Sequence, residues 1–156
     1  MANQKAKGSI ILEILIVVFF VFLVLSLYIP KKLWDEEDKE RELCRNRMTA
    51  IWRLEQEYIR KNQVYTDTLD YLINFIKQDT TKSQVMIDTL LFNNPPDSLH
   101  NCPSTGLPYI LKLREDKLGI KIECPNEDYT IRYYLFFTKK IENHGSITDG
   151  EKSWSK

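Results

Sequence analysis

Residues 8–30 of the chain read GSIILEILIVVFFVFLVLSLYIP, and from Ile10 to Ile29 only Glu13 and Ser26 interrupt the apolar run. About twenty consecutive apolar residues are enough for an α-helix to cross the hydrocarbon core of a bilayer. The remainder of the 156-residue chain is charged and partly aromatic, with room for one modest soluble domain. The sequence therefore predicts one membrane-spanning helix followed by a single soluble domain.

The composition argues against two classes of function. The chain balances 22 basic residues with 22 acidic ones, so its overall charge gives no attraction for nucleic acid. It contains only five glycines, with no glycine-rich loop that would bind phosphate and no nucleophile motif beside a Ser-His-Asp set. We expect neither a nucleic-acid partner nor an enzyme.

The apolar run has three interpretations. A secretory signal peptide is disfavoured, because the run exceeds the usual apolar length and no small-x-small cleavage site follows Ile29. A plain single-span anchor fits the length but leaves Glu13 unexplained, since a carboxylate within lipid costs on the order of 3 kcal/mol. The third interpretation is a prepilin signal, which is cut on the cytoplasmic side so that the apolar run stays in the mature protein.

Residues around the start of the run favour the prepilin signal. The chain opens MANQKAKG, a short leader with two lysines and no acidic residue. Counted from Ser9, Glu13 lies four residues further on and Pro30 twenty-one. This N-terminus resembles that of type IV pilins and type II secretion pseudopilins. The resemblance implies that a prepilin peptidase cuts after Gly8 and methylates the new N-terminus at Ser9, where the family usually has phenylalanine.

The same resemblance implies roles in assembly for Glu13 and Pro30. Cleavage leaves a charged amine on Ser9, and a charge buried in a filament core is tolerated only when it is paired. Glu13 would pair with the amine of an incoming subunit and so fix its register; alternatively, its side chain reaches the nearby membrane interface. Pro30 would form a hinge in the helix, or would simply end the span at the interface.

Beyond Pro30 the sequence predicts that the helix continues to about Asn62. Apolar and aromatic residues recur there at intervals of three to four, typical of one buried helix face. They are Cys44, Met48, Ile51, Trp52, Tyr58 and Ile59, with Glu55 at the same spacing on this face. Together with the span this makes a helix of about fifty residues starting at Ser9. We expect the face to pack on a sheet, because it lacks the sustained heptads of a coiled coil.

The C-terminal half of the sequence predicts a small antiparallel sheet. Tyr109–Arg114 and Leu118–Cys124 flank a polar turn and form a hairpin, and Thr130–Lys139 has the aromatic and β-branched composition of a third strand. Between the long helix and the hairpin we expect a second helix from about Leu69 to Ile76 capped by Thr66 or Asp67, an ambiguous segment Thr80–Phe92, and a turn at Asn93–Asp97. The predicted fold class is α+β, with a long N-terminal helix packed on an antiparallel sheet, as in the pilin-like family.

A weaker resemblance concerns the major pseudopilin of type II secretion. Gly106-Leu107-Pro108-Tyr109 is similar to the motif that opens the sheet in that subfamily, and the terminal Lys152-Ser153-Trp154 is similar too. The resemblance implies a calcium-binding loop near Asp149 and Glu151. Two carboxylates are few for a cation that takes six to eight oxygen ligands, so we expect no cofactor and hold calcium as the alternative.

The cysteines offer two further interpretations. Cys102 and Cys124 each precede a proline at the outer ends of the predicted hairpin, and a disulfide between them would clamp it in an oxidising compartment. Cys44 would then be the odd thiol, buried on the helix face. The alternative is a metal site formed by Cys102, Cys124, His100 and His144, although their spacing matches no zinc pattern.

These observations lead to one leading hypothesis. It divides the chain into a leader (1–8), a membrane and filament-core helix (9–30) and a soluble pilin-like domain (31–156). The protein would be a structural subunit of a type II secretion pseudopilus or related type IV filament. It would lie in the inner membrane with its N-terminus in the cytoplasm and its soluble domain in the periplasm or outside the cell. Its partners would be prepilin peptidase, other filament subunits and the inner-membrane assembly platform. The rival hypothesis is a single-span interaction or sensor protein that never assembles.

Overall fold

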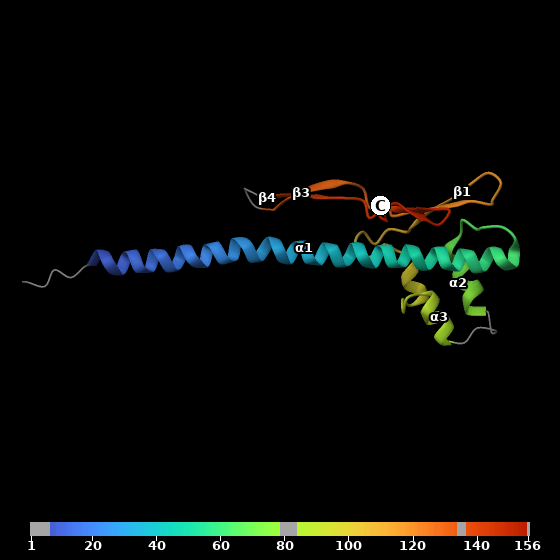
Figure 1. The fold of residues 1–156 in the computed structure, drawn as a ribbon, viewed down its shortest axis with the longest axis horizontal. Coiled ribbons are helices and arrows are strands. Elements are labelled where there is room, and N and C mark those ends of the chain that lie inside the picture. The colour runs from blue at the N-terminus through green and yellow to red at the C-terminus, as the bar shows by residue number, and fades with distance from the viewer. Residues whose placement is uncertain (1–6, 79–83, 134–136, 156) are drawn as a thin grey trace, which may run out of the picture. The chain divides into compact units, whose positions relative to one another are not determined.

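The computed structural model describes residues 7–78, 84–133 and 137–155 (Figure 1). The helices are α1 (Lys7–Asn62), α2 (Leu69–Gln78), α3 (Gln84–Leu90) and the short 3₁₀ helix η1 (Pro96–Leu99). The strands are β1 (Ile110–Leu113), β2 (Ile120–Glu123), β3 (Tyr129–Tyr133), β4 (Phe137–Ile141), β5 (Ser146–Thr148) and β6 (Glu151–Lys152). The fold is α+β, as predicted. It divides into two compact units, Met1–Lys39 and Glu40–Lys156, which we describe separately.

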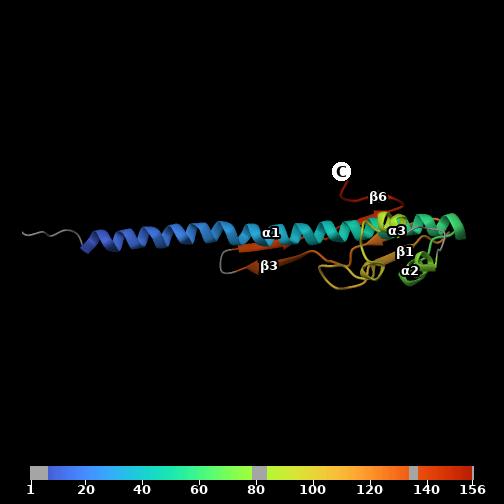
Figure 2. The same cartoon turned by 90° about the horizontal axis from the view of Figure 1, so that it is seen from below.

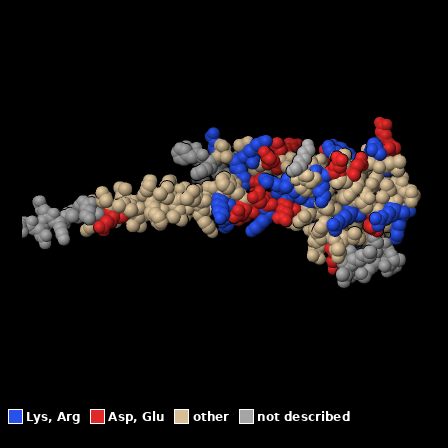
Figure 3. Space-filling view, viewed as in Figure 1, with Lys and Arg blue, Asp and Glu red and all other residues tan. Residues whose placement is uncertain are grey.

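The described part of the first unit is helical. The predicted start of the long helix at Ser9 is confirmed to within two residues, and the helix runs through Pro30 rather than ending there. Apolar side chains from Ile10 to Ile29 are each between 40% and 75% exposed. This stretch is long and apolar enough to cross a membrane, and none of it is buried within the chain. Figure 3 shows charged side chains of both signs gathering beyond it.

The second unit is organised around the C-terminal part of α1. This part is buried on two sides, because the sheet covers one side and α2 and α3 cover the other (Figure 1, Figure 2). The residues that form the core with it come from both layers. From α1 they are Cys44, Met48, Ala50, Ile51 and Leu54; from the other segments they include Leu72, Ile76, Leu91, Leu99, Ile120, Ile122 and Ile147. The predicted buried face is therefore confirmed, and Ala50 and Leu54 widen it.

The main sheet has the strand order β1-β2-β5-β6 among the described residues. The predicted hairpin is confirmed: β1 and β2 pair antiparallel with Leu111 opposite Ile122, and Leu113 opposite Ile120. Along β2 burial alternates, so Ile120 and Ile122 face the core while Lys121 and Glu123 point outward. The motif Gly106–Tyr109 lies immediately before β1, and Gly106 has a φ of +68°, which favours glycine at this turn.

The third strand of this sheet was predicted incorrectly. The segment Thr130–Lys139 does not join β2; instead β3 and β4 pair with each other as a separate antiparallel hairpin, with Tyr129 opposite Ile141. Residues 134–136 lie outside the described part of the chain. The strand that pairs with β2 is β5, with Ile147 opposite Ile122. A continuous run of strand-forming residues predicts extended backbone but not which neighbour it pairs with, and here the run folds back on itself.

The remaining segments follow the sequence closely. The second helix is confirmed and begins at Leu69 as predicted. Just before it, the Thr66 hydroxyl accepts the backbone N–H of Thr68. Of the ambiguous segment, 84–90 forms α3, and 80–83 lies outside the described residues. The predicted turn is also confirmed: Asn93 has a positive φ and η1 begins at Pro96.

Candidate functional site

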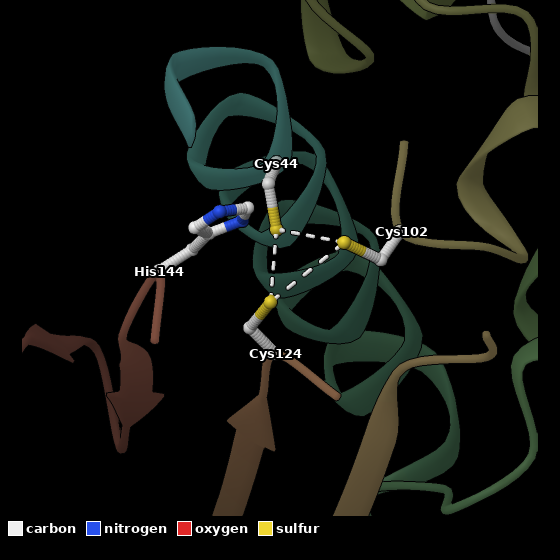
Figure 4. Close-up of side chains that lie close together, drawn as sticks. All are labelled: Cys44, Cys102, Cys124 and His144. Carbon is white, nitrogen blue, oxygen red and sulfur yellow. Dashed lines mark hydrogen bonds between the residues drawn. The ribbon is translucent and has the colours of Figure 1, made fainter. Parts of the chain in front are cut away.

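Four side chains from distant segments meet in the core of the second unit. Cys44 comes from α1, Cys102 from the loop after η1, Cys124 from the residue after β2, and His144 from the loop before β5. Their potential ligand atoms all lie within 4.8 Å of one another. Figure 4 shows the three sulfurs facing each other with the imidazole ring beside them. The cluster therefore ties the long helix to two loops and to the sheet.

The three sulfurs form a nearly regular triangle. The Cys44 Sγ lies 3.3 Å from the Cys124 Sγ and 3.7 Å from the Cys102 Sγ, and the Cys102 and Cys124 sulfurs are 3.8 Å apart. All three cysteines are thiols, each no more than 3% exposed. The separations are too long for an S–S bond of about 2.05 Å and suit sulfurs sharing hydrogen bonds or a common ion.

His144 completes the cluster and is fully buried. Its Nε2 lies 3.3 Å from the side-chain amide nitrogen of Asn126, whereas its Nδ1 is buried with no hydrogen-bond partner among the described residues. The Oδ1 of Asn126 is likewise buried and lacks a partner in the described part of the chain. Buried atoms of this kind are uncommon in a folded core, where almost every polar atom is satisfied.

Hydrogen bonds to backbone carbonyl groups hold the loops that carry these side chains. The N–H of Cys124 donates to the carbonyl of Gly145 at 3.2 Å, which brings the end of β2 against the loop that carries His144. The Arg45 guanidinium donates to the carbonyl of His144 at 2.9 Å. The amide of Asn143 donates to the carbonyls of Cys124 and Asn126. The positions of Cys124 and His144 are therefore fixed by interactions outside the cluster.

A tight loop positions the third cysteine. The N–H of Cys102 donates to the Leu107 carbonyl, and the N–H of Gly106 donates to the Cys102 carbonyl, both at 2.8 Å. Tyr109, which ends this segment, reaches α1, and its hydroxyl lies 3.5 Å from the Cys44 Sγ. The motif singled out in the sequence at 106–109 therefore forms one wall of the cluster.

The side chains of the cluster differ in the direction in which their pKa values are shifted. Hydrogen bonding with the Cys124 and Cys44 sulfurs lowers the pKa of Cys102, and the same network raises the pKa of Cys44. Burial by itself lowers the pKa of His144, but the Cys102 and Cys124 sulfurs outweigh it and raise the value to about 9. The network thus favours negative charge on the Cys102 sulfur in particular, and thiolate is the form in which cysteine binds metal ions.

The predicted disulfide is not formed in this structure. Cys102 and Cys124 do come together, but Cys44, which the sequence assigned to the core as an odd thiol, lies against both of them. His100, considered as a metal ligand, points elsewhere, with its Nε2 3.5 Å from the Asp70 carboxylate. Periodicity placed Cys44 on the buried face, but it does not reveal which loops close over that face.

The loop considered for calcium joins β5 to β6. Asp149 has a positive φ between β5 and β6, and its carboxylate accepts the backbone N–H of Ile120 at 2.9 Å and lies 3.5 Å from the Arg114 guanidinium. Glu151 is exposed at the start of β6. The Asp149 side chain therefore caps the turn and links it to the end of the β1–β2 hairpin.

The residues expected to act in processing and assembly lie along α1. Gly8 and Ser9 are in its first turn, Glu13 is exposed within the apolar stretch, and Pro30 is inside the helix. Residues 1–6 of the predicted leader lie outside the described part of the chain. Comparison with protein-family models, with curated proteins and with solved structures finds no match.

Proposed function

We propose that this protein is a pilin-like structural subunit of a type II secretion pseudopilus or a related type IV filament. The observation that carries the proposal is the contrast along α1. The side chains of its apolar stretch are exposed, whereas the same helix forms the core of the second unit after Glu40. A helix built in this way is complete in its C-terminal part and needs partners, first lipid and then other subunits, for its N-terminal part.

The residues around the start of α1 support the same proposal. Prepilin peptidase would cut between Gly8 and Ser9 and methylate the new amine, leaving the apolar stretch in the mature chain. Glu13 would then neutralise the Ser9 amine of a neighbouring subunit in a filament core that water does not reach. An assembly platform in the inner membrane would add such subunits head to tail, and contacts of this kind do not close on themselves.

Co-expression of the full chain with a prepilin peptidase tests the proposal directly. We expect the mass of the membrane-extracted protein to fall by that of residues 1–8 and to rise by one methyl group. Gly8→Val should abolish the change, because the family resemblance places the cut after a glycine. Ala6→Val enlarges a side chain two residues earlier and serves as the matched control, which should be processed normally.

The rival hypothesis makes the opposite prediction. A single-span interaction or sensor protein would keep residues 1–8 in the presence of the peptidase, and Gly8→Val would then behave like the wild type. That outcome would exclude the filament subunit and leave α1 as a plain anchor. Processing that is unaffected by Gly8→Val would mean that the cut lies elsewhere, and the proposed roles of Ser9 and Glu13 would fail with it.

A further inference from the structure

We propose that Cys44, Cys102, Cys124 and His144 together bind one zinc ion, which joins the long helix to the sheet of the second unit. The cluster would bind zinc whether or not the protein assembles into filaments. The sulfur geometry, the unpartnered nitrogen of His144 and the chemistry of the four ligands all favour this ion.

The sulfur positions match one face of a zinc tetrahedron. With Zn–S bonds of about 2.3 Å and tetrahedral angles, two bound sulfurs lie about 3.8 Å apart. The three separations in the cluster are 3.3, 3.7 and 3.8 Å. The shortest, between Cys44 and Cys124, would lengthen by a few tenths of an ångström, a change that side-chain rotation provides. The thiols are therefore already arranged as three ligands of one ion.

His144 supplies the fourth ligand through Nδ1. This nitrogen is buried, lacks a partner among the described residues and belongs to a ring that lies beside the sulfur triangle (Figure 4). When Nδ1 binds a metal, Nε2 carries the proton and needs an acceptor. Turning the Asn126 side-chain amide by 180° exchanges its nitrogen and oxygen and places Oδ1 against Nε2. Which of the two atoms is the oxygen is assigned from hydrogen bonds of this kind. One ion thus accounts for both orphaned atoms, Nδ1 and Oδ1.

Groups around the cluster also suit bound thiolates. The backbone N–H of Asn126 points at the Cys124 Sγ at 3.5 Å, and the Tyr109 hydroxyl lies 3.5 Å from the Cys44 Sγ. Donors of this kind stabilise the negative charge that three thiolates keep after binding a divalent ion. A cavity of about 340 Å³ lies beside the cluster and is lined in part by Cys124 and Asn126.

The ligand set selects zinc and a structural role. Three thiolates and an imidazole are soft or borderline ligands, unlike the oxygen ligands that calcium and magnesium require. Four protein ligands fill the tetrahedron, so no coordination position is left for water or a substrate, as it is in catalytic zinc sites. The ligands span residues 44 to 144, so one ion fixes segments that are far apart in the chain, and its binding free energy contributes to folding.

A disulfide is the main alternative for these cysteines, and it explains less. Joining two of the thiols transfers two electrons and two protons to an oxidant and leaves the third sulfur unused. It also leaves His144 Nδ1 without a partner. A metal site uses all four side chains and protects the thiols from oxidation in whichever compartment holds the domain.

The test uses the full chain in detergent, with its thiols reduced and its metals removed under anaerobic conditions. We expect cobalt(II) to bind with one equivalent per chain and to give the thiolate-to-cobalt charge-transfer bands and strong visible bands of a tetrahedral site. One equivalent of zinc should then remove these bands. The chain purified from zinc-supplemented cells without chelator should also contain one zinc ion by elemental analysis.

Matched variants locate the site. Cys44→Ser should lose the charge-transfer bands or bind at least 100-fold more weakly, and His144→Cys should keep tetrahedral binding with a fourth sulfur. His100→Ala removes the histidine outside the cluster and should bind like the wild type. Absence of the bands from the reduced wild type would overturn the proposal, and so would equal bands in Cys44→Ser. A chain that leaves zinc-supplemented cells with a disulfide and no metal would also overturn it.

Discussion

The two parts of α1 differ in whether the rest of the chain covers their apolar side chains. From Ile10 to Ile29 the helix presents apolar side chains that nothing in the chain covers. Further along the helix, in the second unit, apolar side chains are fully buried between the sheet and the smaller helices: Cys44, Met48, Ala50, Ile51 and Leu54. The same secondary structure thus serves two purposes. The C-terminal part is stabilised by its own chain, and the N-terminal part depends on a membrane or on other molecules. The free energy of unfolding of the second unit should therefore respond strongly to changes in the C-terminal part of α1 and weakly to changes in the N-terminal part.

The largest effect should follow from removing the proposed zinc ion. A ligand that binds only the folded state stabilises it by RT ln(1 + [L]/Kd), which for a tight zinc site is about 5 kcal/mol or more, so a strong chelator should lower the melting temperature of the second unit by on the order of 20 °C. Circular dichroism of the detergent-solubilised chain checks this. Cys44→Ser should melt at the lower temperature with or without chelator. A wild-type transition that the chelator does not move would argue that the cluster is held by packing alone.

Truncation of a buried side chain in the C-terminal part of α1 should come next. Leu54 is fully buried, and Leu54→Ala should cost about 2–5 kcal/mol, because the cavity is closed by rigid neighbours on both sides. The matched change Leu15→Ala lies in the apolar stretch, where the side chain is 62% exposed, and should change the same free energy by less than about 0.5 kcal/mol. Urea unfolding of both variants measures the difference. Equal effects would mean that the two parts of the helix unfold together.

A buried carboxyl in the C-terminal part should make stability depend on pH. Glu55 is fully buried, one of its oxygens has no partner among the described residues, and burial raises its pKa from 4.5 to about 8. The folded state therefore holds a proton that the unfolded state releases between these pH values. The stabilisation is complete below about pH 4.5 and is lost as the pH rises towards 8. The slope should reach about 1.4 kcal/mol per pH unit.

Glu55→Gln isolates this contribution. The amide keeps the shape of the side chain and an acceptor for the N–H of Thr66, which lies 3.3 Å from the Glu55 carboxylate, but it does not titrate. Urea unfolding from pH 5 to pH 8 should show a shallower pH dependence for the variant than for the wild type. Glu57→Gln changes a carboxylate two residues away whose side chain pairs with Arg60 at 2.9 Å, and should leave the slope in place. Parallel profiles for Glu55→Gln and the wild type would contradict the proposed proton on Glu55.

The sequence predicted the contrast along α1, and of the cluster it grouped Cys102, Cys124 and His144 as an alternative but missed Cys44. A run of apolar residues and a three-to-four spacing are local patterns, and they defined the long helix and the buried face that includes Met48 and Ile51. Strand partners are less local, so the pairing of β1 with β2 across a short turn was predicted, and the pairing of β2 with β5 was not. The cluster depends on contacts between residues up to 100 positions apart, from Cys44 to His144, which spacing along the chain does not encode. The sequence feature that could have indicated the cluster is that all three cysteines lie in or beside segments predicted to be buried, and that His144 is available as a fourth ligand.

Glu13 should have the smallest effect on the stability of the second unit and a distinct effect on assembly. It is exposed and lies within the first unit, so Glu13→Gln should change the free energy of unfolding of the second unit by less than about 0.5 kcal/mol. The amide removes the charge that would pair with the Ser9 amine of a neighbouring subunit but keeps the shape. In cells with the peptidase and an assembly platform, we expect the variant to be processed like the wild type and to give few cross-linked oligomers. Glu36→Gln, an exposed carboxylate beyond the apolar stretch, should assemble normally. If Glu13→Gln assembled equally well, the carboxylate would have no part in setting the register of subunits, and the exposed apolar side chains alone would have to specify it.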